Sequence, residues 1–269
     1  MTAALDTIFV WSHPRALSTA LLRSLAELPH ATTVLEPFMI PWQAEIGFLD
    51  RKRHPNPPNY QDIITNIQSG EYGPSDDTRV QVVKDMACHG GLPLLERIIA
   101  ALPHAKHVLL IRHPYRAIPS YFRAIAADPL SESYTKELIQ EDTSYDCLLQ
   151  YAQRFGAGSF LLVDADDLVR TPATSLQALC DYLGLAYSPS LLNWKPDALP
   201  PTWRDLDAFE GWLDNVASSS GWQERPELGR EVPYPSSCTV LERECIDAHM
   251  PVYRELVQYA SNDVRRSAV

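Results

Sequence analysis

Short apolar runs alternate with amphipathic helical patterns along most of this chain, and this alternation constrains the fold more than any other feature. The apolar runs predict strands near residues 7–11, 32–35, 80–84, 107–111 and 159–163. The helical patterns lie near residues 17–28, 92–101, 115–127, 134–155 and 173–184, and a last one spans 239–259. Strands that alternate with helices pair in parallel. The pattern therefore predicts an α/β fold with a central parallel sheet flanked by helices on both faces.

The 269 residues fit one large domain, and we expect a single domain over 1–269. Two stretches, 51–79 and 194–237, break the alternation and are predicted to be irregular. The second carries Trp194, Trp203, Trp212 and Trp222. Long loops kept by a compact domain are often functional. We interpret both stretches as walls or lids of a substrate pocket, with packing on the outer surface as an equal alternative.

Composition excludes several classes of partner. A net charge of −11 disfavours nucleic acid and anionic membranes, because both are bound through basic surfaces. No apolar run reaches the roughly 20 residues of a membrane span, and the first residues lack the basic start of a secretory signal, so we expect a cytoplasmic protein. The five cysteines are scattered without metal-ligand spacing, so neither a disulfide framework nor a metal is expected. The oligomeric state stays open.

A strand-to-helix turn follows the first predicted strand and carries one cation and two hydroxyls. It reads Ser12-His13-Pro14-Arg15-Ala16-Leu17-Ser18-Thr19-Ala20. Backbone N–H groups and the dipole of a helix N-terminus stabilise an anion there. An ATP- or GTP-hydrolysing loop would need glycines and a lysine, and this turn has neither. It can still bind one phosphate through helix amides, Arg15, Ser18 and Thr19.

A second turn of the same kind follows the fourth predicted strand, with Arg112 at the strand's end and Ser120 in the next helix. Two phosphate sites at the same edge of a sheet indicate a ligand with phosphates at both ends. His13 and His113 each precede a proline in these turns. Donation to a phosphate and a hydrogen bond to nearby backbone are equally open for both histidines.

At this point the chain resembles the sulfotransferases that use 3′-phosphoadenosine-5′-phosphosulfate (PAPS) as sulfonate donor. Residues 15–19 fall on their 5′-phosphosulfate loop, with Ala16-Leu17 in place of the usual Ser-Gly and Ala20 where many relatives have an adenine-stacking aromatic. Arg112 and Ser120 reproduce their 3′-phosphate site. Residues 163–185 resemble a family strand-helix signature, and Ser219-Ser220-Gly221 resembles a late loop that returns to the nucleotide.

The resemblance implies a P-loop NTPase-like sulfotransferase fold and a transferase that moves sulfonate from PAPS to a hydroxyl or amine of a small-molecule metabolite, leaving PAP, without a metal. The cofactor-binding residues would be Arg15, Ala16, Leu17, Ser18, Thr19, Ala20, Arg112, Ser120 and Ser220.

Three positions are candidates for catalysis: Glu36, Lys84 and Arg15. Sulfonate transfer needs a base for the acceptor's proton and cations near the bridging oxygen. Glu36 follows the second strand and precedes a proline that is expected to keep it extended. Relatives place a histidine base where this chain has Met86, so Glu36 is the first choice of base and Asp85 or His89 are alternatives. Lys84 and Arg15 are expected to stabilise charge on the sulfuryl group.

Other functions remain compatible with these residues. The sulfonated product could be an intermediate whose sulfate leaves in an elimination or cyclisation. A P-loop kinase or NTPase-like protein, or a non-catalytic nucleotide-binding protein, could share the same strand-turn-helix plan. The acceptor is not specified by the sequence.

Overall fold

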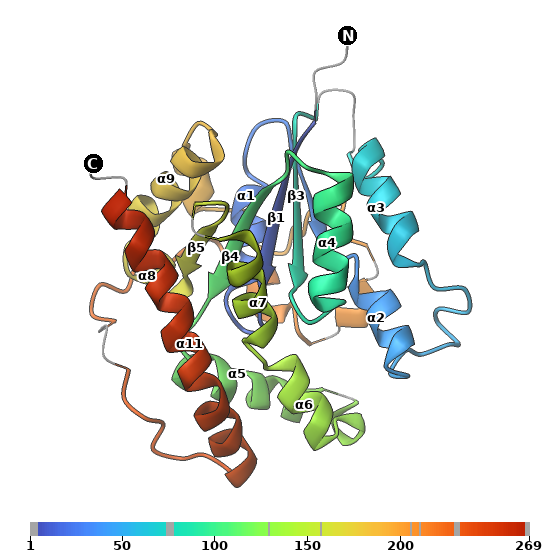
Figure 1. Cartoon of the computed structure of the whole chain (residues 1–269), viewed down its shortest axis with the longest axis vertical. Coiled ribbons are helices and arrows are strands. Elements are labelled where there is room, and N and C mark those ends of the chain that lie inside the picture. The colour runs from blue at the N-terminus through green and yellow to red at the C-terminus, as the bar shows by residue number, and fades with distance from the viewer. Residues whose placement is uncertain are drawn as a thin grey trace.

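The computed structural model describes residues 5–73, 78–128, 130–156, 158–204, 206–209, 211–228 and 232–266. Five parallel strands form one sheet in the order β2-β3-β1-β4-β5 (Figure 1). They are β1 (Asp6–Ser12), β2 (Ala31–Leu35), β3 (Val80–Met86), β4 (Lys106–Ile111) and β5 (Leu161–Asp164). The predicted fold class is therefore confirmed.

Helices fill the connections between the strands. Those of the N-terminal half are α1 (Ser18–Leu25), α2 (Met39–Glu45), α3 (Tyr60–Ser69), α4 (Gly91–Ala101) and α5 (Pro114–Ala127). Those of the C-terminal half are α6 (Lys136–Asp142), α7 (Asp146–Phe155), α8 (Ala165–Arg170), α9 (Pro172–Leu183), α10 (Asp214–Ala217) and α11 (Val240–Arg266). Short 3₁₀ segments lie at Ser131–Ser133, Pro189–Leu192 and Leu206–Phe209.

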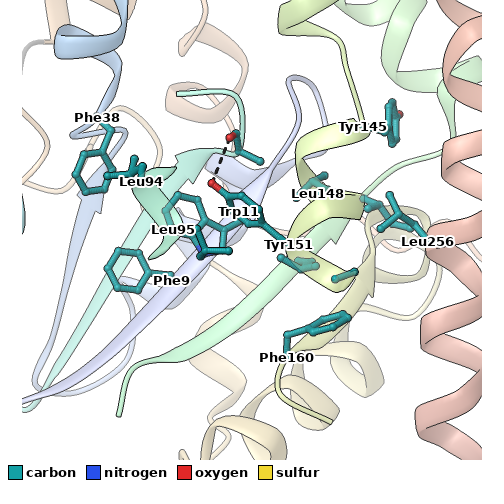
Figure 2. Packing of buried hydrophobic residues seen from close by; sticks show 14 of the residues in the cluster. Phe9, Trp11, Phe38, Leu94, Leu95, Tyr145, Leu148, Tyr151, Phe160 and Leu256 are labelled. Carbon is teal, nitrogen blue, oxygen red and sulfur yellow. Dashed lines mark hydrogen bonds between the residues drawn. The ribbon is translucent and has the colours of Figure 1, made fainter. Parts of the chain in front are cut away.

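The sheet is buried on both faces because alternate strand residues enter two different cores. Phe9 and Trp11 of β1 stack with ring centroids 5.3 Å apart and pack with residues of α3, α4, α7 and α11 (Figure 2). Ile8 and Val10, on the opposite face, pack with α1, α8 and α9. Continuous apolar strands of this kind are typical of parallel sheets covered on both sides.

Two predicted segments differ in the structure. The helical pattern at 134–155 forms α6 and α7, broken where the Ser144 hydroxyl accepts a hydrogen bond from the Asp146 backbone N–H (3.0 Å) and so offers the chain a turn in place of a helical bond. The stretch 51–79 contains helix α3, which begins after Asn59 because the Asn59 side chain accepts a hydrogen bond from the Asp62 N–H. Residues 74–77 of this stretch lie outside the described residues.

The strand register brings the chemistry-bearing residues together. Ser12 at the end of β1 is level with Met86 of β3 and Leu110 of β4, and Leu35 at the end of β2 is level with Lys84. The segments that follow these four strands therefore meet at one edge of the sheet, where ligands of parallel α/β folds bind. Along the described parts of the chain, no helix has the length and apolarity required of a membrane span.

Candidate active site

A cavity of about 630 Å³ opens at this edge of the sheet. The two predicted phosphate turns line one end, which we call the donor end, and it includes Arg15, Ser18, Thr19, Arg112 and Ser120. Glu36 follows β2 and His89 follows β3, on the other side of β1 from β4, and with Trp42 and Asp142 they line what we call the acceptor end. The predicted phosphate-binding residues therefore share one cavity with the predicted Glu36 and His89.

At the donor end, the two phosphate turns are tied to each other by direct contacts. The Arg15 Nε donates to the Ser120 hydroxyl (3.2 Å), and an Arg112 guanidinium nitrogen donates to the Arg15 carbonyl (3.1 Å). Arg15 also lies over the Trp212 ring at 5.8 Å. Arg15, predicted for the 5′ phosphate, thus lies beside Ser120, predicted for the 3′ phosphate, and can serve both ends of a ligand.

His13 joins the two turns as a neutral structural residue. Its Nδ1 lies 2.9 Å from the Pro14 carbonyl, so Nδ1 carries the proton and donates, while Nε2 accepts from the Arg112 backbone N–H (3.0 Å). Burial lowers the pKa of His13 to about 3, which keeps the ring uncharged. Both ring nitrogens bond backbone groups, so of the two alternatives for His13 the hydrogen bond to nearby backbone holds, and not donation to a phosphate.

The turn before α1 has an unusual backbone. Arg15 and Leu17 both have a φ of 62°, in the left-handed region that favours glycine. Leu17 is the N-cap residue of α1 and makes no side-chain cap, so it leaves the first N–H groups of the helix to other partners. Ser18, Thr19 and Ala20 line the cavity next to it, whereas Ala16 is fully buried away from it.

Arg112 shares a buried carboxylate with its neighbour Arg116. Asp166 lies 3.5 Å from the Nε of each arginine. Among the described residues, neither the Arg112 Nε nor the Asp166 Oδ1 has a partner at hydrogen-bond geometry. Both guanidinium groups also line the cavity beside this carboxylate.

The late loop also reaches the cavity, but not through the residue predicted. Ser219, Gly221 and Trp222 line the wall, whereas Ser220 is absent from it and uses its carbonyl to accept from the Trp194 N–H (3.1 Å). Gly221 has a φ of 145°, and a Cβ there would lie 2.3 Å from the Leu192 carbonyl. Only glycine fits this bend, which places Trp222 against the cavity.

At the acceptor end, Glu36 and Lys84 form a buried ion pair. Lys84 is fully buried and Glu36 is 8% exposed, and only Glu36 lines the cavity. Glu36 has a φ of 42°, so the expectation of an extended residue before Pro37 is wrong. The Glu36 N–H bonds the Lys84 carbonyl (2.7 Å), and the reversed φ turns the carboxylate back over β3 toward the lysine.

Asp85 and His89 form a second buried pair. Asp85 accepts hydrogen bonds from the backbone N–H groups of Phe38 and Met86, both at 2.8 Å, and from His89 Nδ1 at 2.6 Å. Burial opposes a charged imidazole, yet the Asp85 carboxylate raises the pKa of His89. Of this pair only His89 lines the cavity, so Asp85 orients the histidine and does not face a substrate.

Asp142, at the end of α6, is the acceptor-end residue that sequence reasoning missed. It accepts a hydrogen bond from the Tyr121 hydroxyl and lies 3.7 Å from the Cys88 thiol. Burial raises the pKa of Asp142. No local pattern marks this residue, because it lies about halfway along a predicted helix that the structure breaks.

Aromatic and apolar side chains complete the cavity lining, among them Met39, Trp42, Phe48, Tyr134, Leu138, Phe209 and Trp212. Two of them belong to the stretch 194–237, parts of which also line the donor end; its residues 205, 210 and 229–231 lie outside the described residues. No described residue of 51–79 lines this cavity. Residues of 51–79, including Pro58, Ile63 and Tyr72, instead line a second cavity of about 180 Å³. Glu36, Met39 and Phe209 line both cavities.

Fold and site together define a P-loop-like α/β protein with a cationic pocket at the carboxyl edge of its sheet. Residues 58–189 match the model of a family described as the sulfotransferase family. The sulfotransferase domain of the Synechococcus PCC 7002 olefin synthase is similar in structure, with a TM-score of 0.58, 21% identity and coverage of 91% of this chain and 95% of that one. Mouse sulfotransferase SULT7A1, complexed with PAP, has a TM-score of 0.53, 14% identity and coverage of 97% and 91%.

This protein therefore has the fold of the sulfotransferases. Among curated proteins it is similar to branched-chain-amino-acid aminotransferase-like protein 1 of Arabidopsis thaliana, at 28% identity over 264 residues and 93% of this chain. The chain spans about two fifths, 41%, of the length of that relative.

Proposed function

We propose that this protein transfers a sulfonate group from PAPS to a hydroxyl or amine of a small molecule. The main observation in support is that Arg15, Arg112 and Ser120 line one cavity together with the N-terminus of α1. Charge-assisted hydrogen bonds from guanidinium groups favour phosphate oxygens, and helix N-terminal amides add a second anion site. The PAP complex of SULT7A1 gives a relative of the same fold with this type of ligand.

In the proposed reaction the acceptor oxygen, or the nitrogen of an amine acceptor, attacks the sulfur of the phosphosulfate. A new S–O or S–N bond forms to the acceptor, the S–O bond to the donor phosphate breaks, and the acceptor's proton moves to Glu36. The products are a sulfate ester, or a sulfamate from an amine, and PAP. Arg15, at the junction of the two phosphate turns, is placed to stabilise charge on the bridging oxygen as it leaves.

Lys84 acts in this scheme as a positioning residue. The sequence led us to expect contact with the sulfuryl group, but the ammonium is fully buried behind Glu36 and does not line the cavity. Its ion pair holds the Glu36 carboxylate in one orientation. The His89 imidazole, which does line the cavity, is the alternative base.

Calorimetric titration with 3′,5′-adenosine bisphosphate, beside 5′-AMP and ATP with magnesium, tests the donor class. We expect micromolar binding of the bisphosphate that is lost without its 3′-phosphate. Arg112→Ala should weaken this binding by about 1.5–3 kcal/mol. Arg97→Ala is the matched control, because Arg97 is exposed on α4 and does not line the cavity.

Preference for ATP with magnesium would overturn the proposal in favour of a kinase or NTPase-like protein, despite the absence of a glycine-lysine loop. Equal binding by the wild type and Arg112→Ala would remove the 3′ site from the scheme. Binding of PAP with no turnover of PAPS across a broad acceptor screen would favour the non-catalytic alternative.

A further inference from the structure

We infer that Cys88, His89 and Asp142 form a zinc site at the acceptor end of the cavity, with an open coordination position facing the cavity. One ligand atom from each residue lies within 4.8 Å of the other two. A tetrahedral zinc ion holds its ligand atoms roughly 3.3–3.8 Å apart. The Cys88 Sγ and an Asp142 carboxylate oxygen are already 3.7 Å apart, so small side-chain movements complete the geometry.

The donor set suits zinc in particular. Thiolate, imidazole and carboxylate are the three protein ligand types that zinc binds, whereas calcium and magnesium select oxygen alone. Three protein ligands with one open position are the pattern of reactive zinc sites, since structural sites are closed by four. His89 and Asp142 line the cavity and Cys88 does not, which puts the open position on the cavity side.

The ligands are held by outer hydrogen bonds of the kind that orient metal ligands. Asp85 accepts from His89 Nδ1 at 2.6 Å and is fixed by two backbone N–H groups, so the other ring nitrogen is left for the metal. The Tyr121 hydroxyl donates to one oxygen of Asp142, which leaves the second oxygen for coordination.

Charge balance also favours an ion of charge two. Binding releases the Cys88 thiol proton and any proton on the free nitrogen of His89. A thiolate, a neutral imidazole and a carboxylate then carry two negative charges, which Zn²⁺ cancels, while Asp85 stays hydrogen-bonded to His89 Nδ1 and two backbone N–H groups. His89 is 3% exposed and Cys88 and Asp142 are half-buried, so an uncompensated charge here would be costly.

No local sequence pattern marks this site, because its ligands lie far apart along the chain. Cys88 and His89 lie in the turn after β3 and Asp142 ends α6, 54 positions beyond Cys88. The inference of a zinc site does not rest on the proposed sulfonate transfer. A hydroxyl or water at the open position would become more acidic through contact with the ion.

The test is zinc content and affinity. The full chain is stripped with a chelator, dialysed against equimolar zinc, and measured by elemental analysis and by competition with a chromophoric chelator. We expect one zinc ion for each chain, and a loss of affinity of roughly 100-fold or more in Cys88→Ala and in Asp142→Asn. Asp85→Asn, which weakens the outer hydrogen bonds that orient His89, should lose about 10–100-fold.

Cys147→Ala is the matched control, because Cys147 is also half-buried but lies on α7 outside the cluster. Cobalt supplies a readout that does not depend on variant stability. The wild type and Cys147→Ala should show a near-ultraviolet thiolate-to-cobalt band, and Cys88→Ala should lack it. No retained zinc in the wild type, or equal zinc in Cys88→Ala and Cys147→Ala, would overturn the inference.

Discussion

The two ends of the cavity differ in which charged side chains they carry and in how those side chains are partnered. At the donor end, three guanidinium groups, those of Arg15, Arg112 and Arg116, line the cavity. Arg112 and Arg116 both lie 3.5 Å from the Asp166 carboxylate, and Arg15 donates to the Ser120 hydroxyl. At the acceptor end, the buried Glu36 carboxylate is paired with Lys84, and the buried Asp85 carboxylate accepts a hydrogen bond from His89.

Because of this difference, we expect the donor end to determine ligand affinity and the acceptor end to determine turnover. Clustered arginine side chains attract an anionic ligand from solution. Buried pairs hold a carboxylate or an imidazole in one orientation, and removing one partner is costly. Substitutions at the donor end should therefore change affinity, and those at the acceptor end should change turnover and stability.

The largest expected effect is on stability, from Lys84→Met. Methionine fills a similar volume but leaves the buried Glu36 carboxylate without its cation. Breaking a buried pair in this way costs about 3–5 kcal/mol. Denaturant unfolding should show this loss, whereas Arg112→Ala, at the donor end, should lose much less. A loss below about 1 kcal/mol for Lys84→Met would contradict the contrast between the two ends.

Glu36→Gln is expected to have the next largest effect, on turnover. The amide keeps the shape of the side chain but cannot accept the acceptor's proton, so kcat should fall roughly 100-fold or more. Affinity for the bisphosphate should not change, because Glu36 lies at the opposite end of the cavity from Arg112. Steady-state kinetics and calorimetry measure the two quantities.

Glu45→Gln is the control for this change, since Glu45 ends α2 and does not line the cavity. Unchanged kcat in Glu36→Gln would move the role of base to His89. A fall in both kcat and bisphosphate affinity would show that the two ends are not independent.

Sequence predicted the donor end better than the acceptor end, for a physical reason. Arg15 and Arg112 lie in two short strand-to-helix turns, and Ser18, Thr19 and Ser120 lie in the helices that follow them, so local spacing is enough to place them at the sheet edge. All five strands were recovered because buried parallel strands are continuous apolar runs. The order of the strands, in contrast, is set by long-range pairing.

The acceptor end depends on contacts that no local pattern contains. The break between α6 and α7 places Asp142 beside Cys88, and the positive φ of Glu36 directs its carboxylate to Lys84. Ser220 was predicted from a resemblance in a loop, yet its neighbours line the wall instead. A shift of one residue in a loop reverses which side chain faces a cavity, and it leaves the composition of the loop unchanged.

His13 allows a test of how rigidly the donor end is held. The folded-state pKa of about 3 lies below the ordinary 6.5, so below pH 6.5 the unfolded chain takes up a proton that the folded protein excludes. Stability contributed by neutral His13 is therefore present above pH 6.5 and lost as the pH falls toward 3. The expected loss is up to about 1.4 kcal/mol for each pH unit in this window.

His13→Gln removes this titration, and its amide can still accept from the Arg112 N–H. Urea unfolding at a series of pH values should give a shallower acid loss for the variant than for the wild type. The control is His104→Gln, because His104 is exposed outside the cavity. Parallel pH profiles for the wild type and His13→Gln would show that the ring is protonated without cost to the fold.

The smallest expected effect on stability comes from Leu17→Gly, a substitution within the donor end. Leu17 has a φ of 62°, a conformation that costs a non-glycine residue about 1–2 kcal/mol. Glycine removes this cost but adds freedom to the unfolded chain, worth about 0.5–1 kcal/mol, and it loses the packing of a partly buried leucine. Stability should therefore change by less than about 1 kcal/mol.

Binding should change more than stability in this variant, because Leu17 lines the cavity beside Ser18 and its side chain limits how closely a phosphate approaches the first amides of α1. We expect calorimetry to show tighter binding of 3′,5′-adenosine bisphosphate. His30→Gly is the matched control: His30 has a φ of 59° in an exposed turn, so the same backbone change there should leave binding unaltered. Weaker binding in Leu17→Gly would mean that the leucine organises the turn, and that the donor end, like the acceptor end, depends on packed side chains for its geometry.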